Sequence, residues 1–510
     1  EVFGFHLAVL DIRQNSSKHD EAIEELEILA GGKNTTPYRS RSETERRKLL
    51  ESWLENSPWT AEAAIQAGPA AADVIGTYKT LAHHVSRHGT DGLGLSIISM
   101  TRDVSDLLAI HVFSRAAGLE SPDKSAAGVC PLPITPLFET LEDLEKAPKV
   151  VTEFLQHPLT QNTIKVLARH EAEVSQRRRL ALVDPGEGSV VLPVEPPPIL
   201  RVMIGYSDSN KDAGLLASQW ALHRSQRGIL KAARQEGAAA RFFHGRGGTV
   251  SRGAGPTHRF LEALPKGTLS GDLRTTEQGE VIGQKYGTVP TAAYNLELLL
   301  AGTAYSTLSQ DGNAEDDPAM TEVFEILSQT SMRAYRKLID QDGFLEFFRQ
   351  ATPIDAVERS TIGSRPSRRT GAAGWADLRA IPWVFSWSQA RFFLPGWYGA
   401  GAALSVLAKD HAKLFRRLRE RLRVWPFARY VFNNLESGLA SADLEVAQWY
   451  AGLVTDVKLR SRISALIQSE FDLVQRGLRE MFSEPLAERR PRFRYTVERR
   501  VKPLRVLHQR

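Results

Sequence analysis

The stretch Val202–Gly214, V-M-I-G-Y-S-D-S-N-K-D-A-G, decides the fold class of this chain. It opens with a short apolar run, Val202–Ile204, which is typical of a buried strand. A polar loop containing Asp208 and Lys211 follows, and Ala213–Gln226 then has the composition of a helix. Strand, loop and helix in this order form the repeating unit of parallel α/β folds, in which ligands bind at the carboxyl ends of the strands.

A second unit of the same kind carries a glycine-rich loop. A predicted strand over Ala238–Phe243 leads into Phe243–Gly253, which reads F-H-G-R-G-G-T-V-S-R-G. Glycines allow positive φ and close approach of the backbone to a ligand. Arg246 and Arg252 bring guanidinium groups that bind oxyanions bidentately, and His244 lies beside them. The loop therefore favours binding of a phosphate or carboxylate, with a solvated surface loop as the alternative.

Other segments extend this pattern along the chain. Leu378–Gly401 predicts a third unit, with Ile381–Phe385 as its strand. The apolar run Leu7–Leu10 predicts a short buried strand that delivers Asp11–Asn15 at its carboxyl end. Cys130–Glu139 is also strand-like and closes on an acid. We therefore predict a helix-rich α/β fold: a partial β-barrel, with active-site loops at the carboxyl ends of its strands, surrounded by many α-helices.

Local signals place several further elements. Ser42 with Glu45 forms a capping-box pattern and predicts the start of a helix. Ile97–Phe113 has apolar residues at helical spacing, so we expect His111 at the edge of the core and not as a ligand. Pro185–Pro198 is rich in proline and glycine and predicts a connector.

The chain divides into two predicted regions. Residues 1–401 are expected to form the barrel and its catalytic site, including the glycine loop 243–255. Residues 402–510 are expected to be helical and to end in a basic tail. Residues 489–510 hold nine Lys/Arg and one acid, Glu498. Such a tail can bind nucleic acid, but a solvated terminal segment explains it more simply, and we predict no nucleic-acid partner.

Composition bounds the class of protein. The chain has 510 residues, is 42% hydrophobic and 25% charged, and carries a net charge of +5. These values are typical of a soluble globular protein with a sizeable core. No apolar run reaches the ~18 residues of a membrane span, and no secretory signal is visible. One cysteine, Cys130, excludes a disulfide or a thiolate metal cluster within the chain. We expect a cytoplasmic protein without a membrane partner.

Two acids and five arginines in strand-end or loop positions suggest one site. Glu139 and Asp208 each close a strand-like run, and two oxygen ligands from separate strands suit Mg²⁺ or Mn²⁺. The arginines in similar settings are Arg13, Arg246, Arg252, Arg365 and Arg379. So many cations around a divalent site predict a substrate with both phosphate and carboxylate. A nucleotide is not favoured, because the chain lacks phosphate-loop and dinucleotide fingerprints.

These residues resemble phosphoenolpyruvate carboxylase of the bacterial and plant type. The glycine loop 243–253 and the segment G-Y-S-D-S-N-K-D-A-G, 205–214, are similar to the two signatures of that family. Further similar segments occur in the same order: D-I-R-Q-N-S (11–16), P-L-F-E-T (136–140), T-E-Q-G-E-V-I (276–282), I-G-S-R-P-S-R-R (362–369) and L-R-A-I-P-W-V-F-S-W-S-Q-A-R (378–391). The resemblance spans nearly the whole chain.

The resemblance implies an activity and assigns roles. Bicarbonate and phosphoenolpyruvate would give oxaloacetate and phosphate, a lyase-class carbon dioxide fixation that feeds the tricarboxylic acid cycle. Glu139 and Asp208 would hold Mg²⁺, or Mn²⁺. The same matching assigns the phosphate to Arg13, Arg246, Arg365 and Arg379, the bicarbonate to Lys211 and Arg252, and the wall of the carbon dioxide pocket to His244.

The chain departs from the family pattern in three places. We find no T-A-H-P-T-E motif, which the family carries in an N-terminal half and whose histidine handles a proton of carboxyphosphate. The family's terminal Asn-Thr-Gly is absent, and the lysine that binds its dicarboxylate inhibitors falls on Ser441. We therefore expect the C-terminal catalytic half of the enzyme, as a fragment, a split gene product or a nicked chain. A separate N-terminal half is one candidate partner, and the resemblance implies a homotetramer. The alternative is a non-catalytic subunit that binds phosphoenolpyruvate or serves assembly.

Overall fold

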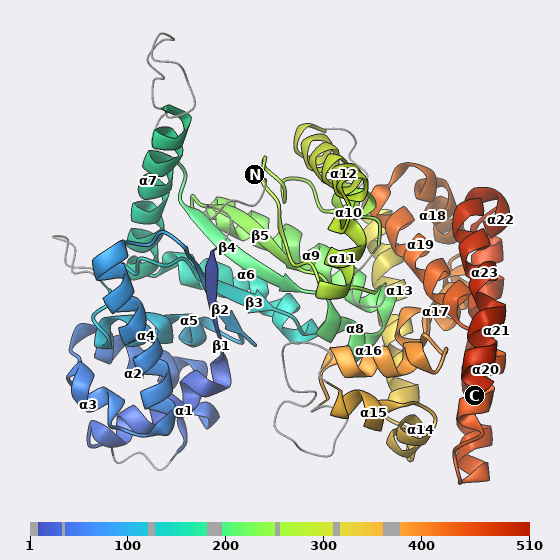
Figure 1. Cartoon of the computed structure of the whole chain (residues 1–510), viewed down its shortest axis with the longest axis horizontal. Coiled ribbons are helices and arrows are strands. Elements are labelled where there is room, and N and C mark those ends of the chain that lie inside the picture. The colour runs from blue at the N-terminus through green and yellow to red at the C-terminus, as the bar shows by residue number, and fades with distance from the viewer. Residues whose placement is uncertain are drawn as a thin grey trace. The chain divides into compact units, whose positions relative to one another are not determined.

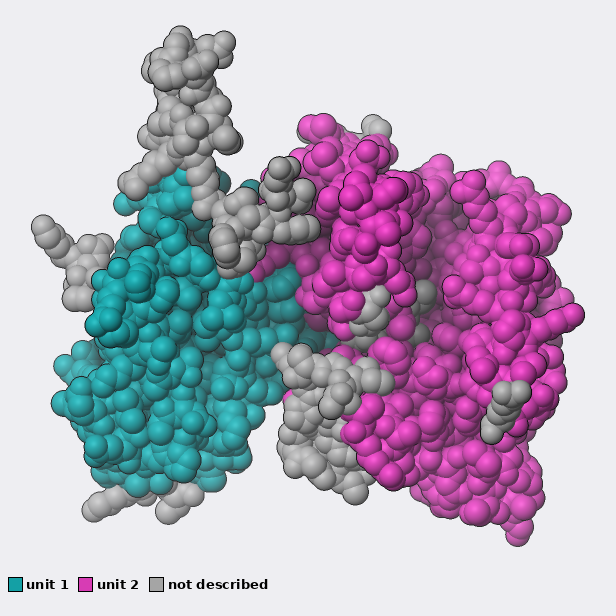
Figure 2. Space-filling model, viewed as in Figure 1, with its two compact units in different colours: residues 1–204, 225–243 teal, residues 205–224, 244–510 magenta. Residues whose placement is uncertain are grey.

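The computed structural model describes residues 9–32, 36–120, 128–180, 196–249, 255–309, 317–360 and 378–509. The chain forms two compact units, shown in different colours in Figure 2. Unit 1 comprises Glu1–Ile204 and Ser225–Phe243, and unit 2 comprises Gly205–Arg224 and His244–Arg510. Each unit is described by itself below.

Six strands form one sheet, and their order in the sheet is their order in the chain. The first four pair in parallel. The strands are β1 (Leu10–Asn15), β2 (Leu93–Ser99), β3 (Ile134–Phe138), β4 (Ile199–Gly205), β5 (Ala239–Gly245) and β6 (Arg274–Thr275). Parallel strands in chain order, joined by helical crossovers, build the wall of a β/α barrel. The predicted helix-rich α/β fold with a partial barrel is therefore confirmed (Figure 1).

The register of the strands places apolar side chains on one face of the sheet. Leu95 and Ile97 lie two residues apart on β2, so their side chains point to the same side. They pack with Leu137 of β3 and Met203 of β4, which are paired directly across the two strands. Phe243 of β5 packs against this cluster. The cluster fixes which strand residues face the core.

Unit 1 surrounds its strands with helices. They are α1 (Ser16–Leu29), the 3₁₀ turn η2 (Tyr38–Ser40), α2 (Glu43–Glu55), α3 (Ala61–Ile65), α4 (Pro69–His88), α5 (Val104–Ala116), α6 (Leu141–Gln156) and α7 (Pro158–Leu180). The predicted capping box at α2 is confirmed, because the Ser42 hydroxyl accepts from the Glu45 amide at 3.3 Å and the Glu45 carboxylate accepts from the Ser42 amide at 2.9 Å. Helix α9 (Leu215–Gln235) belongs to both units.

Unit 2 is largely helical. Besides β6 and part of α9, its described elements are α8 (Ser207–Ala213), α10 (Thr257–Ala263), α11 (Gly279–Tyr286), α12 (Val289–Leu308), α13 (Pro318–Ile339), α14 (Phe344–Gln350), α15 (Ile354–Arg359), α16 (Ala380–Gln389), η5 (Leu394–Gly396), α17 (Ala400–Asp410), α18 (Ala412–Val424), α19 (Pro426–Ser441), α20 (Leu444–Ala451), α21 (Val457–Met481), α22 (Leu486–Arg489) and α23 (Pro491–Gln509). All elements described from Ala400 to Gln509 are helices, as expected for residues 402–510. None of the helices described in the two units is both long and apolar enough to cross a membrane.

Helix α17 lies in close contact with α13 and α21, and two glycines permit this. Gly399 adopts φ 91°, and a Cβ there would lie 2.4 Å from the Ser331 carbonyl oxygen. At Gly401 a Cβ would lie 2.6 Å from the Leu473 Cβ on α21. The buried Glu470 carboxylate accepts from the amide of Gly401 at 2.7 Å and so satisfies a donor at the start of α17. The three helices therefore form one tightly packed group.

Two predicted elements are wrong. Ile381–Phe385, predicted as a strand, lies in helix α16. Most sides of this helix are buried, so its apolar residues follow one another without polar residues at helical spacing. A continuous apolar run of this kind is compatible with a buried strand and with a buried helix. The predicted helix over Ile97–Phe113 starts instead at Val104, because Ile97 belongs to β2. His111 is fully buried, and its Nδ1 lies 2.8 Å from Glu120 Oε1.

Two other predictions need adjustment. Asp208 and Lys211 lie on the short helix α8 and not in a loop. Strand β1 contains the polar residues Asp11–Asn15, which were predicted to lie at the end of a buried strand. None of its residues is fully buried. Residues 1–8 and most of the predicted connector, 181–195, lie outside the described residues.

Candidate active site

In unit 1, Arg13 and Glu139 come together at the ends of two strands. Arg13 lies in β1, and Glu139 directly follows β3. The Arg13 Nη2 atom lies 3.9 Å from Glu139 Oε2, and their side chains are 27% and 12% exposed. A separation this long is at the weak end of ion pairing, while both groups keep access to solvent. The structure thus brings one predicted phosphate ligand next to one predicted metal ligand.

The start of helix α6 fixes the backbone at Glu139. Thr140 caps this helix, and its hydroxyl accepts from the Asp143 amide at 3.2 Å. In return, the Asp143 carboxylate accepts from the amides of Thr140 at 3.1 Å and Glu139 at 3.4 Å. This capping box orients the strand-to-helix turn, and the helix N-terminus favours negative charge there. Glu139 is therefore presented from a rigid turn.

In unit 2, helix α8 presents Asp208 and Lys211. Asp208 is partly exposed, whereas Lys211 is 2% exposed. The Tyr335 hydroxyl of α13 donates to the Lys211 carbonyl oxygen at 2.9 Å. A second bond joins the hydroxyls of Ser209 and Ser218 at 2.7 Å. These contacts attach α8 to α13 and α9 and so position the backbone that carries Asp208 and Lys211.

His244 is the most deeply buried of the predicted site residues. It lies in β5 with no exposed surface, and its Nδ1 is 2.9 Å from the Tyr206 hydroxyl. Burial, and after it the positive charge of Arg246, lowers the pKa of His244 to about 3. The imidazole is therefore neutral at physiological pH, which suits the wall of a pocket for an uncharged molecule.

Arg246 follows β5 and is held by an aromatic ring. Its guanidinium carbon lies 3.8 Å from the centroid of Phe260, and Arg246 is 7% exposed. Nη2 donates to the Gly255 carbonyl oxygen at 3.4 Å. Phe260 also contacts His244 edge-on at 5.3 Å between ring centroids. A cation–π contact in a largely desolvated setting keeps the guanidinium ready for an oxyanion.

The remaining predicted residues are placed as follows. Arg379 directly precedes α16, without a side-chain capping bond to that helix, and is partly buried. Arg252 and Arg365 lie outside the described residues. Arg13 and Glu139 belong to unit 1, and the other described site residues belong to unit 2: Asp208, Lys211, His244, Arg246 and Arg379.

Sequence reasoning did not identify Tyr206 and Phe260 as site residues. Tyr206 lies within the quoted segment 205–214, and its contact with His244 spans 38 residues of sequence. Phe260 lies on α10, beyond the glycine loop. An aromatic residue two positions before Asp208 is a signal that could have identified Tyr206. Nothing in the local sequence distinguishes Phe260 from an ordinary core residue.

The predicted metal ligands suit a hard divalent cation. Carboxylate oxygens are the ligands that Mg²⁺ takes from proteins, usually one or two, with water and substrate oxygens completing the octahedron. Within the described residues there is no cluster of three or more His, Cys, Asp or Glu that could hold a metal.

The burial of His244 has a consequence for stability. Its pKa is about 3 in the folded state and near 6.5 when unfolded, so the unfolded state binds more protons between these values. Stability should therefore fall as the pH decreases from 7, by about 2 kcal/mol at pH 5 from this group. Urea unfolding at both pH values should show a smaller pH dependence for His244→Gln than for the native chain. The exposed His88→Gln is the control, and an unchanged pH dependence in His244→Gln would contradict the assignment.

Together these features define a class of protein. A parallel sheet in chain order presents charged residues at its strand ends, and a buried arginine lies beside a neutral histidine. This is a helix-rich α/β protein of the barrel type, with a site suited to a phosphorylated or carboxylated ligand.

Comparison with known proteins gives the family. The phosphoenolpyruvate carboxylase family model matches residues 1–509, and the chain belongs to this family. It is 39% identical over 476 residues to phosphoenolpyruvate carboxylase of Mycobacterium avium, covering 92% of this chain and 47% of that protein. It is 36% identical over 501 residues to the enzyme of Methylorubrum extorquens, covering 97% and 51%. The chain spans about half the length of the curated relatives that it matches.

Proposed function

We propose that this chain supplies the half of a phosphoenolpyruvate carboxylase that binds phosphoenolpyruvate and its divalent cation and carries out the carboxylation to oxaloacetate. The observation that carries the proposal is the cluster of His244, Arg246, Phe260 and Tyr206, found in a chain that matches the family over residues 1–509. It combines a desolvated cation for a phosphate oxygen with neutral walls for carbon dioxide.

The residues would act in three steps. A bicarbonate oxygen attacks the phosphorus of phosphoenolpyruvate, and the bond from phosphorus to the enol oxygen breaks, which gives carboxyphosphate and the enolate of pyruvate. Arg246, with Arg13, would stabilise the charge on the phosphoryl oxygens. Carboxyphosphate then releases carbon dioxide and phosphate. Finally, the enolate carbon attacks carbon dioxide, held beside the neutral His244, and forms oxaloacetate.

Mg²⁺ or Mn²⁺, when bound by Glu139 and Asp208, would supply positive charge to the enolate oxygen. Lys211 and Arg252 would help to place bicarbonate, and Arg365 and Arg379 would contribute to binding of the phosphate.

We also propose that the working enzyme is a homo-oligomer, a tetramer as the family resemblance implies. The alternative is a non-catalytic subunit that binds phosphoenolpyruvate or serves assembly and needs an N-terminal half.

Binding tests the proposal directly. In the 510-residue chain with Mg²⁺, we expect Arg246→Gln to weaken phosphoenolpyruvate binding by about 10- to 100-fold, because one charge-assisted hydrogen-bonding group contributes roughly 1.5–3 kcal/mol. Isothermal titration calorimetry measures the change. Arg333→Gln on α13 is the matched control, since Arg333 is exposed and its Nε donates within its own helix, to the Gln329 carbonyl oxygen at 3.2 Å. Equal affinity in the Arg246→Gln variant and the native chain would refute the assignment.

A further inference from the structure

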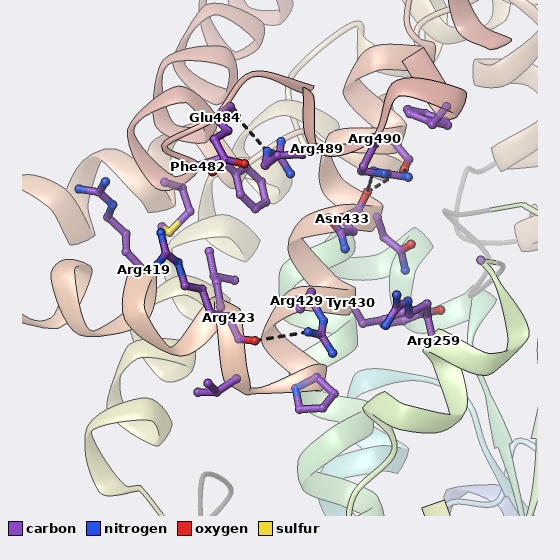
Figure 3. Close-up of a pocket in the computed structure, with 18 of the residues that line it drawn as sticks. Arg259, Arg419, Arg423, Arg429, Tyr430, Asn433, Phe482, Glu484, Arg489 and Arg490 are labelled. Atoms are coloured by element: carbon purple, nitrogen blue, oxygen red, sulfur yellow. Dashed lines mark hydrogen bonds between the residues drawn. The ribbon is translucent and has the colours of Figure 1, made fainter. Parts of the chain in front are cut away.

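Unit 2 contains a cavity of about 1170 Å³ whose walls are rich in arginine. It lies between α10, α18, α19 and the segment around α22 (Figure 3). Three acids also line it: Glu262, Glu420 and Glu484. The arginines that line it are Arg259, Arg416, Arg419, Arg423, Arg429, Arg489 and Arg490. The seven arginines and three acids of the lining therefore carry a net charge of +4 around one open cavity.

One wall is a stripe of arginines on helix α18. Arg416, Arg419 and Arg423 are spaced by three and four residues, so they share one face of the helix. Their guanidinium groups make no hydrogen bond or ion pair with any residue in the described part of the chain. The carbonyl oxygen of Arg423 accepts a hydrogen bond from Arg429 at 3.3 Å. Arg417 and Arg421 of the same helix, by contrast, pair with Asp317 at 2.8 and 3.2 Å. Like charges at this spacing repel each other, and a bound anion would relieve the repulsion.

The opposite wall is ordered by stacking. The guanidinium of Arg489 lies 3.6 Å from the centroid of Phe482, and that of Arg490 lies 4.3 Å from Phe493. Both arginines contact the Glu436 carboxylate, so two positive charges share one negative charge. Side chains held in this way lose little conformational freedom when they bind an anion.

A buried donor at the cavity lacks a partner. Asn434 lines the cavity and is 4% exposed, and its Nδ2 has no hydrogen-bond acceptor among the described residues. A buried amide donor without an acceptor is unfavourable. An oxygen atom of a ligand in the cavity would satisfy it. This observation points to a ligand independently of the charge.

We propose that this cavity binds a compact polyanion that carries two or more phosphate groups. The stripe from Arg416 to Arg423 extends over about 10 Å along α18, which suits negative charge spread over several phosphates. In Figure 3, Arg419 and Arg423 project from one side, and Arg259 and Arg490 lie on the other. Charges that converge from several elements suit a compact ligand better than an extended acidic peptide. Neither the stripe nor Asn434 belongs to the residues proposed for the carboxylation.

Sodium tripolyphosphate, titrated calorimetrically into the 510-residue chain, tests the proposal. We expect the double variant R419Q/R423Q to raise the Kd at least tenfold. The matched control K409Q/R476Q removes two exposed positive charges from α17 and α21, outside the cavity lining, and should change the Kd less than twofold. Arg246→Gln should leave this binding within twofold. If R419Q/R423Q is insoluble, Arg416→Gln alone should raise the Kd at least threefold.

Three outcomes would overturn the proposal. One is the absence of tripolyphosphate binding at millimolar concentration. Another is equal weakening in R419Q/R423Q and K409Q/R476Q, which would show a non-specific response to net charge. The third is tighter binding of a deca-glutamate peptide than of tripolyphosphate, in which R419Q/R423Q raises the Kd of the peptide and leaves that of tripolyphosphate unchanged. This result would identify the cavity as a peptide site.

Discussion

Asp208→Asn, in a complete enzyme that contains these 510 residues, is expected to lower kcat by about 1000-fold or more, and Glu139→Gln should act similarly. A divalent cation at a developing enolate contributes several kcal/mol to the transition state, and each 1.36 kcal/mol is a factor of ten in rate. Each substitution keeps the shape of the side chain but removes a charged ligand. The effect should appear in kcat and in the Mg²⁺ concentration required for half-maximal rate.

Steady-state assay of oxaloacetate with a coupled dehydrogenase measures both quantities. The control for Glu139→Gln is Glu142→Gln, three residues further on. Glu142 is exposed on α6 and pairs with Lys146 at 2.7 Å, so its loss should change kcat less than twofold. A near-normal rate at saturating Mg²⁺ in either Asp208→Asn or Glu139→Gln would remove that residue from the proposed metal site.

The 510-residue chain, expressed alone, is expected to bind phosphoenolpyruvate. It should make at least 100-fold less oxaloacetate than the same chain supplied with an N-terminal half in trans. The family resemblance places the proton-handling histidine in that half, and such a group typically contributes 10²–10⁴-fold to the rate. Without it, water reaches the enolate and protonates it before carbon dioxide is captured. The products should then be pyruvate and phosphate, formed slowly and only with bicarbonate.

Parallel assays with malate dehydrogenase for oxaloacetate and lactate dehydrogenase for pyruvate separate these products. A chain carrying Asp208→Asn, combined with the same N-terminal half, should form neither product at an appreciable rate. If the native chain alone carboxylated phosphoenolpyruvate at the full rate, another residue would have to replace the histidine. If it bound no phosphoenolpyruvate, the assignment of substrate binding to this half would be wrong.

The fold class was predictable because strand and helix runs alternate clearly along the chain. The prediction succeeded where polar loops separate the runs, as at Cys130–Glu139, which contains β3. It was wrong at Ile381–Phe385, where helix α16 is buried by the rest of unit 2 and has no polar face. Apolar and polar residues alternate periodically only in an element with one side in the core and one side in water. An element buried on all sides therefore shows no such periodicity in its sequence.

The candidate site was predictable in its charged residues and not in its aromatic ones. Arg246 and His244 stand out because of the glycines around them, whereas Phe260, which stacks on Arg246, reads as one more apolar residue. Helix α18 carries a run of arginines. Three of them line a cavity, which depends on α19 and α22 folding against α18. Contacts between distant segments determine these features, and local sequence does not record them.

The packing of α17 between α13 and α21 also bears on synthesis of the protein. Gly399 fits against Ser331 and Gly401 against Leu473, so this group cannot close until α21 has left the ribosome. The segments of unit 1, by contrast, are complete at Phe243. At about 5–20 residues per second, the 238 residues from there to Met481, the end of α21, take roughly 10–50 s to synthesise. During that interval the apolar faces of α13 and α17 lack their partner, and this is the period in which we expect the nascent chain to depend most on chaperones.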